Sequence, residues 1–281
     1  MHSISIRVPA TTANLGPGFD TLGVALQLYN KVTLSPSPEV PDDPFIADAI
    51  DLFFRTTKRR YQPFDVQVKG DVPRSSGLGS SVTVRLGILI ALNQWFKCPL
   101  SPEKILELTI KLEGHPDNAV PAFYGGFFAG SATHHFRAPV APKLYFVAII
   151  PSFELGTKSV RAILPHRVPL SDAVINIQNS ALAVAAFASG KYELLKGASD
   201  DRLHQPYRER FIPGFYNALR AAEKNGALTA YLSGAGPTLV AITLEKPEKI
   251  GRAMLHELSR AGNKNASLKI LHADNRGAKI V

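Results

Sequence analysis

The stretch VPRSSGLGSSVTV, residues 72–84, places two glycines and four serines between two differently patterned segments. Residues 64–73 alternate polar and apolar side chains as a half-buried strand does, whereas residues 81–96 repeat apolar side chains with a helical period. The first N–H groups of a helix lack intrahelical partners, and the helix dipole makes that end positive. The stretch is therefore either a turn with a serine cap or a binding site for an anion, and alone it favours neither.

Glycine and serine are residue types that suit a phosphate at such a turn. Gly77 and Gly79 have no side chains, so an anion can approach the backbone, and serine hydroxyls can donate to phosphate oxygens or ligate Mg²⁺. The available hydroxyls are those of Ser75, Ser76, Ser80 and Ser81. The stretch is not a Walker P-loop, since no Gly-Lys-Ser/Thr follows the glycines, and it is not a G-x-G-x-x-G motif.

The composition indicates a soluble, globular protein that can bury a large core. Of 281 residues, 45% are hydrophobic and 20% charged, and no run of about 18 apolar residues predicts a membrane-spanning helix. Residues 1–18 lack an apolar signal core, so we expect no targeting peptide. Cys98 is the single cysteine, which excludes an intramolecular disulfide and a thiolate metal cage and favours a reducing, cytoplasmic location.

The net charge of +9 raises the question of a nucleic-acid partner. The basic residues are scattered, and the tightest cluster is TTKRR at residues 56–60, which we interpret as a solvated helix face. No zinc-finger spacing or aromatic-basic RNA-binding motif accompanies it. We therefore expect no nucleic-acid partner and no membrane partner, and the positive charge favours anionic small molecules instead.

The first half of the chain predicts strands and helices around the glycine-rich stretch. Residues 3–8 form an expected strand closed by Pro9, followed by a loop over residues 10–23 and a second strand over residues 24–36. A helix is expected over residues 101–114, with Ser101 as its cap.

The second half predicts a small α+β sandwich. Residues 142–151 form an expected central strand, and a helix opened by Ser171 or Asp172 follows. Beyond it, helices and strands interleave, with helices at residues 213–227 and 247–262 and strands at residues 228–234, 238–244 and 267–273. We place a domain boundary between residues 151 and 167.

Two further stretches carry chemical groups. EGHPDN, residues 113–118, holds two carboxylates, one imidazole and one carboxamide, so metal, base and substrate roles are all available. A single imidazole argues against zinc and for Mg²⁺ ligated by oxygen. LSGAGPTLVA, residues 232–241, is either a tight hairpin turn or a turn whose backbone meets the phosphates from the second domain.

With these three stretches in view, the chain resembles the GHMP kinase superfamily and, within it, the homoserine kinases. Further motifs occur in the family's order, and the resemblance spans essentially the whole chain. The most specific is VPATTANLGPGFDTLGVAL at residues 8–26, which other superfamily kinases do not share; the others are VPAFYGG, GTKSVRAILP and HQPYRERFIPGF.

The resemblance implies an enzyme that transfers the γ-phosphoryl group of ATP to the side-chain hydroxyl of L-homoserine. The product is O-phospho-L-homoserine, on the route to threonine, and the implied cofactors are ATP and Mg²⁺. The implied α+β fold has an N-terminal ATP-binding domain like the second domain of ribosomal protein S5 and a ferredoxin-like C-terminal domain. We assign them to residues 1–155 and 156–281. Family members are often dimers, which makes a homodimer a candidate assembly.

The resemblance also implies site residues. Asp20 pairs with the substrate ammonium and Asn14 lies nearby, whereas Arg161 and Arg208 clamp its carboxylate. His115 and Thr157 make further substrate contacts, and Ser81 and Glu113 ligate Mg²⁺. The residues expected around the triphosphate are Pro73, Arg74, Ser75, Ser76, Gly77, Leu78, Gly79, Ser80, Ser81, Gly234 and Gly236. Without the resemblance, YRERF at residues 207–211 is typical of an ordinary charged helix face.

Two details of the catalytic region differ from the superfamily pattern. Related kinases use an aspartate as base; here we expect Asn118 and His115 to orient the hydroxyl and leave the role of Asp117 open, since a loose transition state needs no strong base. Val82 stands where a small residue is usual, so it is expected to add bulk beneath the phosphates. Val82→Ala is then expected to lower the KM for ATP or leave it unchanged.

Three other interpretations remain. Another GHMP kinase, acting on mevalonate or a sugar, would not need Asp20. A non-catalytic nucleotide-binding relative would be expected to have lost Glu113 or the paired arginines, and this chain keeps both. A nucleic-acid-binding module is suggested by the net charge alone.

Overall fold

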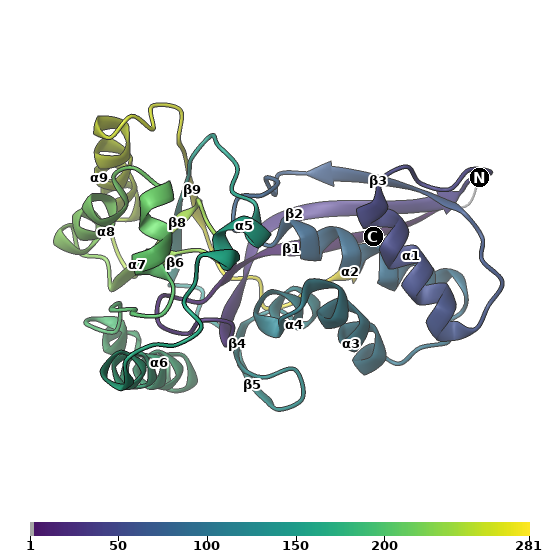
Figure 1. Cartoon of the computed structure of the whole chain (residues 1–281), viewed down its shortest axis with the longest axis horizontal. Helices are drawn as coiled ribbons and strands as arrows, with labels where there is room; N and C mark the ends of the chain where they lie inside the picture. Colours follow the sequence, from purple (N-terminus) through teal and green to yellow (C-terminus); the bar gives the residue numbers. More distant parts are fainter. Residues whose placement is uncertain (1–2) are drawn as a thin grey trace.

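The computed structural model describes residues 3–281, which form two antiparallel sheets (Figure 1). The first sheet follows the order β10-β1-β2-β4-β5, and β3 pairs with the far end of β2. β2 is long enough to pair with β4 at its start and with β3 at its end. The strands are β1 (Ile4–Ala13), β2 (Leu22–Pro36), β3 (Phe64–Gly70), β4 (Phe127–Gly130), β5 (His135–Ala138) and β10 (Lys279–Ile280).

The first strand is longer than the sequence predicts. Pro9 was expected to close it, yet β1 continues to Ala13. The register shifts between Pro9 and Ala10, so a bulge accommodates the residue that lacks an N–H. The loop between β1 and β2 is therefore shorter than expected and spans residues 14–21. The longer strand places the loop between the two halves of the chain.

Four helices cover one face of the first sheet. α2 matches the helix predicted over residues 81–96, and α3 has the predicted Ser101 cap, whose hydroxyl accepts from the Lys104 N–H. α1 was not predicted; its sequence signal is Asp43 before Pro44, and the Asp43 carboxylate caps the helix. Apolar side chains of helices and sheet share one core. The helices are α1 (Pro44–Thr57), α2 (Ser80–Trp95), α3 (Pro102–Glu113) and α4 (Pro116–Tyr124).

The second sheet has the order β7-β8-β6-β9, with α8 and α9 packed against it. The prediction of a central strand over residues 142–151 is confirmed, because β6 lies between β8 and β9. The following helix begins at Leu170 after Pro169, rather than at a Ser171 or Asp172 cap. The elements are β6 (Tyr145–Ile150), β7 (Thr229–Leu232), β8 (Leu239–Thr243), β9 (Ser267–Leu271), α6 (Leu170–Ser189), α8 (Phe215–Lys224) and α9 (Pro247–Arg260).

The chain passes between the two sheets more than once. β6 precedes residue 155 but belongs to the second sheet, and β10 returns the C-terminus to the first sheet beside β1 (Figure 1). A shared core joins the halves, where Phe127 of β4 stacks on Phe187 of α6 with ring centroids 4.2 Å apart. The two sheets therefore do not coincide with residues 1–155 and 156–281, and the division into these two domains stays a prediction.

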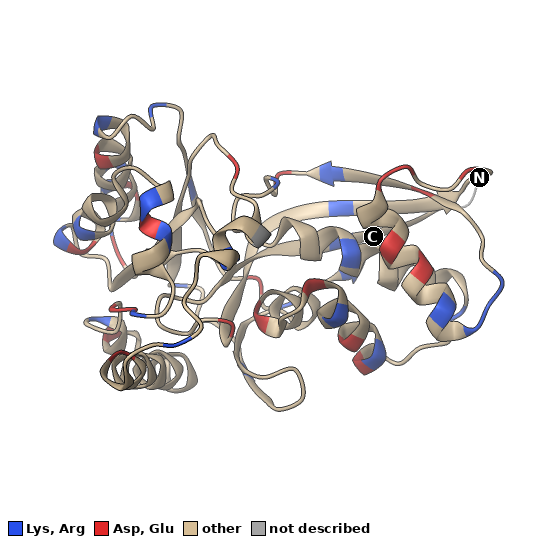
Figure 2. Cartoon of the chain, viewed as in Figure 1, with Lys and Arg blue, Asp and Glu red and all other residues tan. Residues whose placement is uncertain are grey.

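Lys and Arg residues are distributed over both halves of the molecule (Figure 2). The predicted helix face at residues 56–60 is wrong, because α1 ends at Thr57 and the left-handed Lys58 stops it. The three basic side chains lie beyond the helix and are exposed. Within residues 3–281, no helix combines the length and apolar character needed to cross a membrane.

Candidate active site

A cavity of ≈ 570 Å³ is lined by residues from both halves of the chain. Its walls include the loop after β1, the glycine-rich stretch, the start of α4 and the short helices α5 (Thr157–Ala162) and α7 (Gln205–Arg208). The structure thus brings together most of the predicted site. The predicted residues that line the cavity are Asn14, Asp20, Ser75, Ser76, Gly77, Gly79, Ser80, Ser81, Glu113, His115, Asp117, Asn118, Thr157, Arg161, Arg208 and Gly234.

The glycine-rich stretch is not a serine cap. The N-cap of α2 is Gly79, which has a positive φ of 69° and cannot offer a side-chain acceptor. Ser80 and Ser81 are the first residues of the helix, and both line the cavity. The positive end of α2 therefore faces the cavity with N–H groups and hydroxyls available for an anion.

Gly77 and Gly79 are required by contacts within the protein. Both have positive φ, which favours glycine. A Cβ on Gly77 would overlap the Ser233 carbonyl oxygen, and a Cβ on Gly79 would overlap the Thr11 hydroxyl. The Ser233 hydroxyl also donates to the Gly77 carbonyl over 2.7 Å. The missing side chains thus let the loop close against β1 and the turn after β7.

Ser81 and Glu113, the predicted magnesium ligands, are in contact. The Ser81 hydroxyl donates to Glu113 Oε2 over 2.7 Å, and Arg85 Nη1 lies 3.0 Å from Glu113 Oε1. The Glu113 side chain is 7% exposed, so it is held between these partners at the cavity wall. One hydroxyl and one carboxylate oxygen form a donor set that fits a hard divalent cation.

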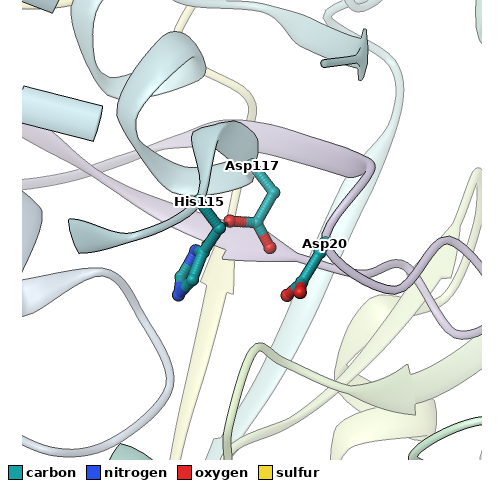
Figure 3. A group of neighbouring side chains, drawn as sticks. All are labelled: Asp20, His115 and Asp117. Carbon is teal, nitrogen blue, oxygen red and sulfur yellow. Dashed lines mark hydrogen bonds and ion pairs between the residues drawn. The ribbon is translucent and has the colours of Figure 1, made fainter. Parts of the chain in front are cut away.

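The start of α4 holds the remaining groups of EGHPDN. Asp117 Oδ1 accepts from His115 Nδ1 over 2.6 Å and from Asn118 Nδ2 over 3.2 Å. The Thr11 hydroxyl donates to Asn118 Oδ1 over 2.7 Å, which fixes the orientation of the amide. Figure 3 shows the Asp117 carboxylate between His115 and Asp20.

His115 has a raised pKa. Burial by itself lowers the pKa, but the hydrogen bond and the negative charge of Asp117 outweigh it. One ligand atom each from Asp20, His115 and Asp117 lie within 4.8 Å of one another (Figure 3). Asp20 is already engaged by Arg161, so this group is an ion-pair and hydrogen-bond cluster.

The loop over residues 14–21 carries the predicted ammonium partner. Asn14 Oδ1 accepts from the Asp20 N–H over 3.0 Å, and Asn14 Nδ2 donates to the Gly234 carbonyl over 3.0 Å. Asp20 forms a bidentate ion pair with Arg161 of α5. The two residues predicted to bind opposite ends of the amino acid therefore neutralise each other here.

Arg208, the second predicted carboxylate partner, is 2% exposed. It does not belong to a solvated helix face, because α7 turns its side chain inward beneath the cavity. Burial lowers its pKa to about 10, so the guanidinium remains charged near neutral pH. A buried arginine at a cavity wall suits recognition of an anion.

Four predicted nucleotide contacts do not line the cavity. They are Pro73, Arg74, Leu78 and Gly236. The Leu78 side chain is fully buried in the core, and the Gly236 backbone packs against Gly77. The contacts of these four residues with the triphosphate stay predictions, and for Leu78 they are restricted to the main chain.

Val82 does not line the cavity. It is 1% exposed and packs in the core between the helices and the first sheet. It occupies the third position of α2, so its side chain points away from the cavity that Ser80 and Ser81 line. The bulk expected beneath the phosphates is therefore not found at the cavity, because the packing of α2 on the sheet directs this side chain into the core.

Several cavity residues were not predicted. Arg85 holds Glu113, and its guanidinium stacks 3.9 Å from the Phe45 ring centroid. Phe45 and Asp48 come from α1 and extend the cavity wall. Phe19 lies under both predicted carboxylate-binding arginines. The Asp43-Pro44 helix signal is the sequence feature that points to α1.

The family emerges from comparison with known proteins. The GHMP kinases N terminal domain matches residues 44–126, and the GHMP kinases C terminal family matches residues 183–260. Together with full-length relatives above 30% identity, these matches settle the family. The chain belongs to the GHMP kinases. The predicted α+β GHMP fold is thereby confirmed.

Relatives of this GHMP kinase are named homoserine kinase. That of Clostridium beijerinckii is 40% identical and that of Aquifex aeolicus 38%; each alignment covers 99% of this chain and at least 98% of the relative. The solved homoserine kinase of Cytophaga hutchinsonii has a TM-score of 0.90 and 28% identity, covering 100% of this chain and 98% of that one. The mevalonate kinase of Methanococcus jannaschii, at 15% identity, a TM-score of 0.70 and coverage of 97% and 98%, shares the fold.

Proposed function

We propose that this chain phosphorylates the side-chain hydroxyl of L-homoserine with ATP and releases O-phospho-L-homoserine, a step on the route to threonine. The observation that carries the proposal is the cavity itself. It combines the positive end of α2 with Asp20, Arg161 and Arg208, which suit the two charges of an amino acid. Near-full-length relatives named homoserine kinase support the same activity.

The triphosphate binds at the start of α2. Its oxygens accept from the first N–H groups of the helix and from Ser80, while Ser75 and Ser76 lie along the same wall. The turn after β7 approaches from the other side through Gly234. Excess positive charge on the chain favours such an anionic ligand.

Ser81 and Glu113 hold Mg²⁺, which supplies charge neutralisation for the phosphates when bound. Both offer oxygen atoms, and they already lie within hydrogen-bond distance of each other. Arg85 keeps Glu113 oriented at the cavity wall. The magnesium assignment rests on this donor set.

Homoserine binds between the β1–β2 loop and the second half of the chain. Asp20 receives the ammonium, Arg161 and Arg208 receive the carboxylate, and Thr157 lines the same region. Binding then exchanges the Asp20–Arg161 ion pair for contacts with the two substrate charges.

His115 and Asn118 orient the attacking hydroxyl. Asn118 is fixed by Thr11 and Asp117, and His115 is fixed by Asp117. A loose transition state depends on positioning and on charge stabilisation more than on a strong base. Asp117 is then the residue that holds both orienting groups, and its role as base is the alternative to be tested.

The proposal is tested by a coupled assay of ADP release with Mg-ATP and four candidate acceptors: homoserine, threonine, serine and mevalonate. Homoserine is expected to give the highest kcat/KM. Preference for mevalonate would indicate another GHMP kinase activity, and nucleotide binding without turnover would indicate a non-catalytic relative. No turnover of homoserine would falsify the proposed function.

We further propose a cytoplasmic enzyme that acts without nucleic acid and assembles as a homodimer. The single cysteine and the distributed basic residues support the first two points. An apolar, exposed face on α6, including Leu170 and Ile177, suits an assembly contact. Light scattering of the purified protein tests the dimer, and a monomeric mass at assay concentration would contradict it.

A further inference from the structure

Arg208 is anchored through one nitrogen of its guanidinium. Nη1 donates to the Gly234 carbonyl over 3.0 Å and lies 3.3 Å from His204 Nδ1. Nε is buried and has no partner among residues 3–281. Nε and Nη2 form one edge of a guanidinium, the edge that accepts a carboxylate side-on. Hydrogen bonds at Nη1 thus hold the arginine, and the Nε–Nη2 edge remains free to bind a carboxylate.

His204 supplies one of the two anchors, and its tautomer follows from its partners. Nε2 lies 2.8 Å from the Gly16 carbonyl, which can only accept, so Nε2 carries the proton. Nδ1 faces Arg208 Nη1, which can only donate, so Nδ1 accepts. A neutral ring with this tautomer satisfies both neighbours at once.

The surroundings keep His204 in that state. The residue is 0% exposed, and burial, together with the nearby positive charge of Arg208, lowers its pKa despite the opposing charge of Asp201. Its ring stacks on Phe19 with centroids 5.2 Å apart. The Asp201 carboxylate accepts from the His204 and Gln205 N–H groups, which fixes the start of α7. The ring therefore has little freedom to turn.

Gly16 belongs to the same loop as Asn14 and Asp20. His204 thus connects the loop that carries the ammonium partner to the arginine that binds the carboxylate. We infer that His204 is a positioning residue for the amino-acid substrate, setting the spacing between Asp20 and the free edge of Arg208 through two hydrogen bonds. This inference rests on the proposed role of Arg208 as a carboxylate ligand.

Two conservative variants separate the two hydrogen bonds. His204→Gln places an amide N–H near the Nε2 position, so it keeps the hydrogen bond to the Gly16 carbonyl. It has no acceptor at the Nδ1 position and therefore loses the hydrogen bond from Arg208 Nη1. His204→Asn places an amide oxygen near the Nδ1 position, so it keeps the acceptor for Arg208 and loses the bond to Gly16. Each variant is checked for folding by its thermal midpoint and by its KM for ATP.

The readout compares homoserine with 3-aminopropan-1-ol, which is homoserine without its carboxylate. The discrimination ratio is the inhibition constant of the amino alcohol divided by the KM of homoserine. This ratio does not depend on the fraction of enzyme that is folded. A structural defect therefore leaves it unchanged, whereas a misplaced carboxylate ligand lowers it.

His204→Gln is expected to raise the KM of homoserine roughly tenfold or more and to leave the inhibition constant of the amino alcohol near its native value, so the ratio falls. His204→Asn is expected to weaken both ligands, because the Asp20 loop shifts, so the ratio stays near its native value. An unchanged ratio in His204→Gln overturns the inference.

Arg208→Lys separates failure of the inference from failure of the proposed site. A lower ratio in Arg208→Lys combined with a native ratio in His204→Gln means that Arg208 binds the carboxylate without help from His204. A native ratio in Arg208→Lys means that the carboxylate role of Arg208 is itself wrong. Both results refute the positioning role of His204.

Discussion

Arg161 and Asp20, 141 positions apart in the chain, form an ion pair in which both carboxylate oxygens accept from the guanidinium. The pair is partly exposed, with 43% of the Arg161 and 27% of the Asp20 side chain accessible. Each residue is proposed to bind one charge of the substrate. The two charges therefore already neutralise each other within the protein, and under the proposed function homoserine replaces this one internal ion pair with two intermolecular ones.

Asp20→Asn is expected to raise the KM for homoserine by roughly 10- to 100-fold. The substitution leaves the substrate ammonium with a neutral amide oxygen in place of a negatively charged carboxylate. The KM for ATP should stay near the native value. Steady-state kinetics with each substrate varied in turn measures both. Asp51→Asn is the matched control, since Asp51 makes an exposed ion pair with Arg55 on α1. An equal change in both variants would contradict a substrate role for Asp20.

Glu113→Gln is expected to increase the Mg²⁺ concentration needed for half-maximal activity by more than roughly tenfold. The amide keeps an oxygen for Arg85 but removes the negative charge that a divalent cation requires. Magnesium titrations of initial velocity measure the change. Glu107→Gln, at an exposed ion pair with Lys104, is the control. An unchanged magnesium requirement would indicate that Glu113 does not ligate the cation.

Asp117→Asn is expected to retain near-normal turnover, and Asn118→Ala to lose it. The asparagine at position 117 still accepts from His115, whereas alanine at position 118 removes the amide that Thr11 and Asp117 hold. A true general base is worth roughly 10²- to 10⁴-fold in rate, so single-turnover rates resolve the two cases. The reverse pattern would identify Asp117 as the base.

His115 is expected to titrate above the ordinary histidine pKa of about 6.5, because Asp117 stabilises the charged ring in the folded protein. A raised folded-state pKa means that this pair stabilises the fold fully below about pH 6.5. The contribution is lost as pH rises through the folded-state pKa. NMR titration of the ring carbon protons measures the pKa. Asp117→Asn should lower it, and an unchanged value would rule out this cause.

Val82→Ala is expected to destabilise the fold by about 1–2 kcal/mol and to leave the KM for ATP unchanged, because the side chain fills the core. Urea unfolding measures the free energy, and initial rates measure the KM. Val40→Ala, at an exposed position before α1, should cost much less. A marked rise in the KM for ATP in Val82→Ala, without loss of stability, would indicate that Val82 contributes to nucleotide binding.

Local patterns predicted the elements whose cause is local. The helix after Gly79, the Ser101 cap and the central strand β6 depend on periodicity and on capping residues within a few positions. The strand beyond Pro9 was missed because a bulge in the pairing with β2 accommodates the proline. The direction of Val82 follows from the packing of α2 on the sheet.

By itself the sequence determined which chemical groups the site contains: the glycine-serine stretch before a helix, the carboxylates and imidazole of residues 113–118, and two arginines. The tertiary structure alone decided which of these groups meet and which are buried. Arg208, which locally is typical of a charged helix face, is buried at the cavity wall, and Arg161 pairs with Asp20 across 141 positions. The physical reason is that burial and long-range charge pairing depend on which segments the two sheets bring together, and no local pattern encodes that.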